Sequence, residues 1–242
     1  MDTQRSDSFA TLRVIAEHLR RVSFPNLQRP AVPAKAPATP ELIGWATQLY
    51  CFSWMRHFCV LVNGIVTLSD AGDIPAARIV MRSVFELNAH AYYVKKHLKQ
   101  HIDAGHFSAA WEFLRPIGAG SRYINKQHPE ESEMFPSPPH IRKAINYFAE
   151  RLPDARESYS YLSEFCHPNL LAFSQYYGWT SPETVTFIDH QPLAGTGSTA
   201  SASIEGLLAI EEMLNLAHEK DIRAVLRGLF EAVVENTPGG QA

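Results

Sequence analysis

Apolar and polar positions along much of the chain repeat with the period of an α-helix, and the pattern is clearest from Pro75 to Leu98. This stretch begins with proline, contains no glycine and places apolar residues at three- and four-residue steps along one side. One polar seam interrupts the apolar surface, and its members follow at four-residue steps: Arg78, Arg82, Glu86 and His90. We therefore predict a central helix whose polar seam is either a solvated stripe or a covered network.

Six other segments carry helical periodicity or helix-start signals, and prolines or glycines separate them. The predicted helices span residues 8–22, 41–68, 107–114, 140–152, 154–167 and 201–235. Prolines recur from 23 to 40 and indicate an extended strap. Aromatic residues and a short alternation around 173–192 predict a small β-hairpin or aromatic flap. The expected fold is mainly α, a multi-helix up-and-down bundle with this hairpin or flap inserted before the last helix.

These elements divide the chain into three predicted parts: an N-terminal helix and strap over 1–39, a bundle domain over 40–236 and a disordered tail over 237–242. The helix at 41–68 is apolar enough to raise the question of a membrane, but Arg56 and His57 lie at its centre. An arginine in the middle of a bilayer costs at least about 2.5 kcal/mol, so we expect no membrane span. Long apolar helices make a homodimer a reasonable expectation.

The composition is that of an ordinary globular protein, 45% hydrophobic and 19% charged, with a net charge of −3. This balance argues against a sequence-independent nucleic-acid surface, although a local basic patch would still allow RNA binding. The three cysteines, Cys51, Cys59 and Cys166, form no Cys-x-x-Cys motif. We therefore expect reduced thiols. Because the first residues also contain no apolar signal segment, we expect a cytoplasmic protein.

A second polar cluster lies on the predicted helix 154–167, where Glu157, Tyr161 and Glu164 share a face and His167 follows Glu164 by three positions. Glu-x-x-His is the spacing of carboxylate-bridged di-metal bundles. A histidine at a helix C-terminus is also favoured by the helix dipole without any metal, and this is the interpretation that we prefer. We expect no cofactor. The metal-dependent alternative would use the set Glu86, His90, Glu164 and His167.

Two motifs carry a resemblance to a known family. Arg78-x-x-x-Arg82-Ser-Val-Phe-Glu86, paired with Tyr161-Leu-Ser-Glu164-Phe-Cys-His167-Pro168-Asn169, resembles an uncharacterised bacterial helical family, domain of unknown function 5677, over about residues 40–235. More distantly, the chain resembles the HEPN class of four-helix bundles found in toxins and phage-defence proteins. That resemblance implies a metal-independent ribonuclease whose signature is Arg, four to six residues, then His.

The HEPN signature itself occurs here about as often as chance predicts. The matching pairs, Arg13 with His18 and Arg122 with His128, lie outside the two motifs above. A HEPN-like site would therefore take its residues from different helices. We expect Arg82 or Arg78 to stabilise the phosphate charge, His167 to act as general base and Glu86 to orient them. Further residues expected to line the site are Arg78, His90, Tyr161, Glu164 and Asn169.

Three functions from different classes follow from these patterns. The first is a HEPN-like, defence- or toxin-associated ribonuclease using Arg82, Glu86 and His167. The second is a metal-dependent bundle enzyme. The third is a non-catalytic interaction or ligand-sensing module, in which the same polar residues form a structural network and the aromatic flap covers a ligand.

Overall fold

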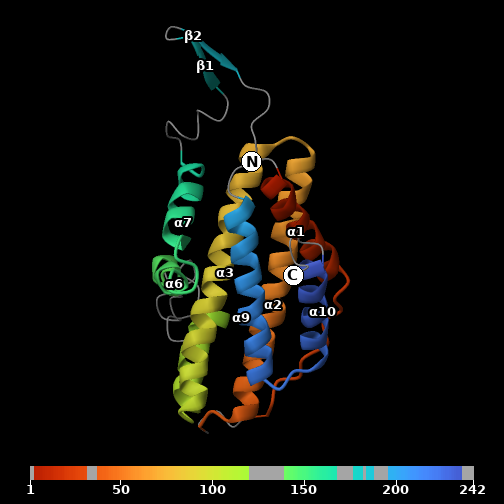
Figure 1. Cartoon of the computed structure of the whole chain (residues 1–242). Helices are drawn as coiled ribbons and strands as arrows, with labels where there is room; N and C mark the ends of the chain where they lie inside the picture. Colours follow the sequence, from red (N-terminus) through yellow and green to blue (C-terminus); the bar gives the residue numbers. More distant parts are fainter. Residues whose placement is uncertain are drawn as a thin grey trace.

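A computed structural model of the chain describes residues 3–31, 37–119, 139–167, 177–181, 184–187 and 196–235. The packed part of these residues is all-α and consists of eight helices (Figure 1). The helices are α1 (Thr3–Arg20), α2 (Pro40–Asp70), α3 (Ile74–Asp103), α4 (Phe107–Ala119), α6 (Ile141–Phe148), α7 (Ala155–Glu164), α9 (Thr196–Leu216) and α10 (Asp221–Glu235). The predicted helical bundle is thereby confirmed.

The helix predicted to be central, α3, packs against α2, α4, α6, α7 and α9. It starts where Asp73 accepts a hydrogen bond from the backbone N–H of Ala76, with Pro75 in the first turn. No glycine or further proline interrupts it before Asp103. The two helices that carry the other residues of the candidate site, α2 and α7, both contact α3.

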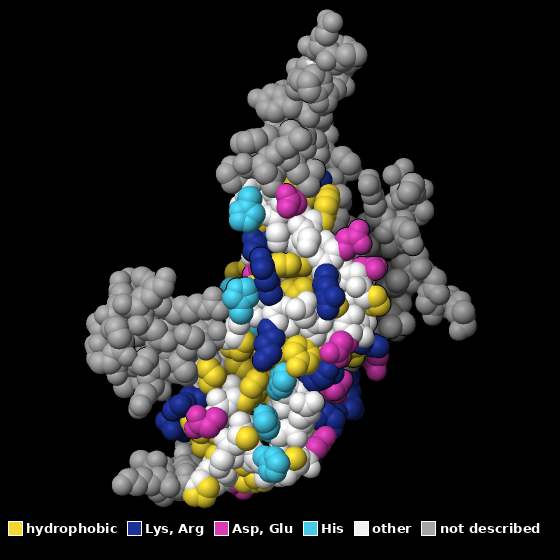
Figure 2. Space-filling view, turned by 90° about the vertical axis from the view of Figure 1, so that its left-hand side faces the viewer, with side chains coloured by type: hydrophobic (Ala, Val, Ile, Leu, Met, Phe, Trp, Pro, Cys, Tyr) yellow, Lys and Arg dark blue, Asp and Glu magenta, His cyan; other side chains and the backbone are white. Residues whose placement is uncertain are grey.

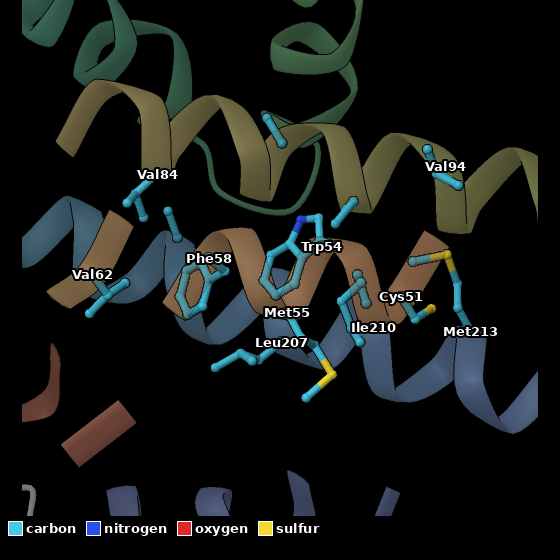
Figure 3. Packing of buried hydrophobic residues seen from close by; sticks show 14 of the residues in the cluster. Cys51, Trp54, Met55, Phe58, Val62, Val84, Val94, Leu207, Ile210 and Met213 are labelled. Carbon is cyan, nitrogen blue, oxygen red and sulfur yellow. The ribbon is translucent and has the colours of Figure 1, made fainter. Parts of the chain in front are cut away.

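The core lies where α2, α3 and α9 meet (Figure 3). Trp54 and Phe58 of α2 stack with ring centroids 4.7 Å apart, and the Trp54 Nε1–H donates to the Leu87 carbonyl of α3 at 2.9 Å. Leu207 and Ile210 of α9 close the core from the third side. The hydrogen bond lets a bulky indole be buried without an unpaired donor.

The C-terminal region corrects one prediction, because the single helix expected over 201–235 is two helices, α9 and α10. His218 adopts a left-handed backbone conformation, with φ of 56°, and ends the first helix. The Glu219 carboxylate then accepts hydrogen bonds from the backbone N–H groups of Asp221, Ile222 and Arg223. These bonds satisfy the free donors at the start of α10 and so allow a new helix to begin there. The apolar periodicity therefore continues across the boundary between two helices.

The first helix packs against α2, α9 and α10, and its Leu12 and Ile15 are fully buried. The division of the chain at 39 and the disordered tail stay predictions.

In the stretch where a hairpin was expected, two short strands, β1 (Tyr177–Ser181) and β2 (Thr184–Phe187), pair antiparallel with Trp179 opposite Val185. The rest of 173–192 before α9 lies outside the described residues.

One described helix, α2, is long and apolar enough to cross a membrane by length and composition, and 44% of its most apolar window is buried in the bundle. A core helix of a soluble protein meets the same criterion. Arg56 and His57, which motivated the expectation of no membrane span, are exposed on the outer face of α2.

Candidate functional site

The polar seam of α3 is a covered network and not a solvated stripe. Arg78 is 4% exposed, and the side chains of Arg82 and Glu86 are 26% and 30% exposed. The cover over these three residues is α7, which packs on α3. The fourth seam residue, His90, faces α2 instead. The seam is therefore divided between two neighbouring helices.

Three side chains are hydrogen-bonded to one another between α3 and α7, and we call them the seam cluster: Arg82, Glu86 and Tyr159. The Glu86 Oε1 atom accepts from Arg82 Nε at 3.1 Å and from the Tyr159 hydroxyl at 3.0 Å. Arg82 Nη2 donates to the same hydroxyl oxygen at 3.3 Å. One carboxylate oxygen thus receives two donors, one of them charged, and the geometry fixes all three groups.

The guanidinium of Arg82 stays charged in this setting. Burial lowers the pKa of Arg82, but contacts with Cys166 and Tyr159 and the charge of Glu86 outweigh it, so the pKa lies above its ordinary value. Burial lowers the pKa of Arg78, and the nearby Tyr161 opposes that shift. An arginine remains protonated at neutral pH even so. The seam therefore holds two cations and one carboxylate beneath α7.

Arg78 and its neighbours show how α7 lies on α3. The Arg78 Cζ atom is 4.7 Å from the centroid of the Phe165 ring, a cation–π contact that covers the guanidinium. Tyr159 contacts Glu86, eight residues further along α3, so the two helices run antiparallel. Arg78 and Glu86 are about 12 Å apart along the axis. Phe165 covers Arg78, and His167 follows Phe165 by two residues in the sequence.

The other predicted site residues have different surroundings. Glu164 and His167 are exposed, and Tyr161 packs edge-on against Phe165 with ring centroids 4.9 Å apart. Asn169 lies outside the described residues, as does the pair Arg122 and His128. In the part of α7 that the structure describes, Tyr159 is the residue in hydrogen-bond contact with Arg82 and Glu86. The catalytic partnership of His167 with these residues stays a prediction.

His90 takes part in a separate contact with α2. Its Nδ1 atom lies 3.1 Å from the Tyr50 hydroxyl oxygen. Burial lowers the pKa of His90 and raises the pKa of Tyr50 well above its usual value, so both groups are neutral near pH 7 and share one hydrogen bond. His90 is therefore not part of the seam cluster.

The metal-dependent alternative gains no support from this geometry. Over the described residues, which include all four members of the set Glu86, His90, Glu164 and His167, no group of three or more His, Cys, Asp or Glu side chains could hold a metal ion. Glu86 faces α7, whereas His90 faces α2.

Tyr159 is the functional candidate that the sequence patterns missed. The polar face of the predicted helix consists of Glu157, Tyr161 and Glu164. The inward face of α7 follows a different stripe at helical spacing, in which Ala155 and Leu162 are buried and Tyr159 lies between them. That stripe was the available signal, because a tyrosine among buried positions brings its hydroxyl into an interface.

The surface around the site is shown in Figure 2, which views the molecule from the side where α6 and α7 lie in Figure 1. Lysine, arginine and histidine side chains follow one another along this face, and most of the visible aspartate and glutamate side chains lie towards one edge. Although the net charge of the protein is −3, its basic and acidic side chains therefore gather in different places on the face that Figure 2 shows.

Comparison with known proteins finds one family. Residues 48–184, more than half of the chain, match DUF5677, a family of unknown function. The matched range contains both motifs on which the resemblance was based, and it ends before α9. No curated protein and no solved structure shows a significant match.

Proposed function

Because the chain belongs to the DUF5677 family, whose function is unknown, we propose a function from the site itself: HEPN-like, metal-independent cleavage of RNA at the contact of α3 with α7. The observation that supports it is the seam cluster, in which a charged arginine, a carboxylate and a tyrosine hydroxyl are held within hydrogen-bond distance while part of each charged group stays exposed. Exposed His167 ends the same covering segment.

The reaction would be a transesterification within the RNA strand. His167 removes the proton from a ribose 2′-hydroxyl, the 2′-oxygen attacks the adjacent phosphorus, and the 5′-oxygen leaves and takes a proton from water. Arg82 stabilises the charge that develops on the phosphate oxygens. Glu86 acts as a positioning residue, because its hydrogen bonds hold Arg82 and Tyr159 in place. The products carry a 2′,3′-cyclic phosphate and a 5′-hydroxyl.

A non-catalytic module is the second candidate, and one observation favours it. Arg82, Glu86 and Tyr159 are hydrogen-bonded to one another across two helices, as a structural clasp would require. In that case α7 and its continuation would serve as an interaction segment clamped to α3. A homodimer and a cytoplasmic location remain expectations under either proposal.

The test uses 5′-labelled single-stranded RNA incubated with purified protein in excess EDTA. We expect wild-type protein to yield fragments ending in 2′,3′-cyclic phosphate, and His167→Ala to lower the rate by about 100-fold or more. Glu157→Ala, a change at an exposed position of the same helix, is the matched control and should leave the rate unchanged. Intact RNA with folded wild-type protein would refute the ribonuclease proposal and leave the clasp.

A further inference from the structure

A cavity of about 650 Å³ lies at the end of the bundle remote from the seam cluster. Its walls come from residues 26–28 of the strap, the first two turns of α2, the end of α3, the start of α4 and residues 216–218. Ile102, which lines it, is about 24 Å further along α3 than Glu86. The volume falls within the range of about 300–1,000 Å³ that is typical of small-molecule sites.

The lining contains aromatic and aliphatic side chains together with polar side chains, three of which are carboxamides. Trp45 and Phe107 contribute aromatic rings, and Ile43, Ile102 and Leu216 contribute aliphatic side chains. The polar part includes three carboxamides, those of Asn26, Gln28 and Gln48. Each carboxamide offers both a donor and an acceptor in one plane. Gln48 Nε2 already donates to the Ala217 carbonyl at 3.2 Å, which fixes this side chain and leaves its oxygen as an acceptor.

Few charged side chains lie at this cavity, and its lining also includes the imidazole of His218. Glu41 is an acidic lining residue, and the Arg29 guanidinium lies 5.8 Å from the centroid of the Trp45 ring. Neither an anion nor a cation therefore meets a concentrated opposite charge. The groups present suit a neutral, planar molecule whose edge carries both donors and acceptors and whose faces are aromatic, because carboxamides bond the edges of such rings and aromatic side chains contact their faces.

We propose that the cavity between the strap, α2 and α9 binds a small neutral heterocycle of the nucleobase type, free or as a nucleoside. The carboxamides of Gln28 and Asn26 recognise its edge, and Trp45 and Phe107 contact its ring. The site is separate from the seam cluster, so occupancy by the small molecule and cleavage of RNA are independent properties of the chain.

Gly44 offers a direct way to fill the site. It lines the cavity on α2, and a Cβ added there would meet only the Ala217 carbonyl oxygen, at 3.9 Å, on the facing wall. A Cβ is therefore accommodated at this position, and we expect the further atoms of leucine to occupy space between the two walls. Gly228 of α10 provides the matched control, since a Cβ there meets nothing within 4 Å and the residue does not line the cavity.

The experiment is titration calorimetry of the full chain with adenosine, uridine, D-ribose and octanoate, with thermal unfolding of every variant recorded. We expect wild type and Gly228→Leu to bind adenosine or uridine with a Kd of about 100 µM or tighter, and Gly44→Leu to bind at least about tenfold more weakly. Gln28→Ala changes an exposed strap residue and should weaken binding several-fold without altering the melting temperature.

Three results would overturn the proposal: no binding of either nucleoside to wild type, binding of ribose or octanoate in their place, or nucleoside binding that Gly44→Leu and Gln28→Ala leave unchanged. RNA cleavage by Gly228→Leu should equal that of wild type. Loss of cleavage in His167→Ala with nucleoside binding retained would separate the two sites.

Discussion

The two contacts that α3 makes on different sides, with α9 and with α7, have opposite physical characters. Towards α9 the helices approach closely through small and fully buried residues such as Gly206 and Asn88. Towards α7 the contact includes the partly exposed charges and hydroxyl of the seam cluster. A close-packed contact resists any change of shape, whereas a polar contact can open locally at lower cost. The close-packed side of α3 thus faces α9, and the side that carries the proposed site faces α7.

The contact with α9 includes a buried amide. Asn88 is 0% exposed, and its side-chain nitrogen and oxygen have no hydrogen-bond partner among the residues that the structure describes. A Cβ added at Gly206 would lie 2.0 Å from the Asn88 Oδ1 atom and 3.0 Å from its Cβ. Glycine is therefore required at this crossing for the two helices to keep their present separation.

The largest expected effect comes from Gly206→Ala. The added methyl group must displace Asn88 or separate α3 from α9, and overpacking of this kind costs about 1–3 kcal/mol. Alanine should raise helix propensity by roughly 0.5–1 kcal/mol at any helical glycine, so Gly228→Ala, where a Cβ meets nothing within 4 Å, is the matched control. Urea unfolding should show loss of stability at 206 and a small gain at 228.

A double mutant sharpens this result. Asn88→Ala removes the atoms with which the new methyl group collides, so Gly206→Ala should cost at least about 1 kcal/mol less in the Asn88→Ala protein than in wild type. Equal costs in the two backgrounds would mean that something other than Asn88 requires glycine at 206.

A smaller effect is expected on the α7 side from Tyr159→Phe. The change removes one hydroxyl that donates to Glu86 and accepts from Arg82, and such a loss costs about 1 kcal/mol. Hydrogen exchange should locate the effect, with faster exchange of α7 amides and little change in α9. Tyr147→Phe is the control, because its ring contacts with Tyr93 and His97 do not involve the hydroxyl. Uniform loss of protection through the bundle would contradict a local clasp.

The ion pair within the same cluster should contribute less again. A double-mutant cycle with Arg82→Ala and Glu86→Ala is expected to give a coupling of about 0.5–1 kcal/mol, because both side chains are about a quarter to a third exposed and solvent screens them. The coupling should fall as salt is added. A coupling above about 3 kcal/mol would instead indicate a pair removed from solvent.

The sequence predicted the side of this comparison that depends on periodicity. Four-residue spacing identified the polar seam, and proline at the first turn with no glycine before Leu98 identified α3 as a long central helix. Periodicity does not report which neighbour covers which part of a helix. The sequence therefore gave no reason to separate His90, which contacts α2, from Arg82 and Glu86, which contact α7.

Two of the features that the sequence did not predict depend on how helices pack, and a third depends on a local side-chain cap. Tyr159 was overlooked because its hydroxyl gains a role only when α7 lies antiparallel on α3. In the sequence, Gly206 is only a residue of low helix propensity. The need for glycine there becomes evident when the structure places Asn88 against it. The break at His218 depends on Glu219 capping the next helix through its side chain, which apolar periodicity does not encode.

The smallest expected effect concerns His90, the seam residue on the α2 side. Burial lowers the pKa of His90 below its ordinary value of 6.5, so the folded protein keeps the ring neutral while the unfolded chain binds a proton as the pH falls through about 6.5. His90 therefore favours folding above that pH, and this contribution is lost on acidification. Urea unfolding between pH 7.5 and 5 should show stability decreasing with pH, and His90→Gln should reduce that slope. Burial also lowers the pKa of His97, so the slope should decrease again in the variant that carries His97→Gln as well. An unchanged slope in His90→Gln would show that the ring is already open to solvent, and the contact with α2 would then resemble the contact with α7 more than the contact with α9.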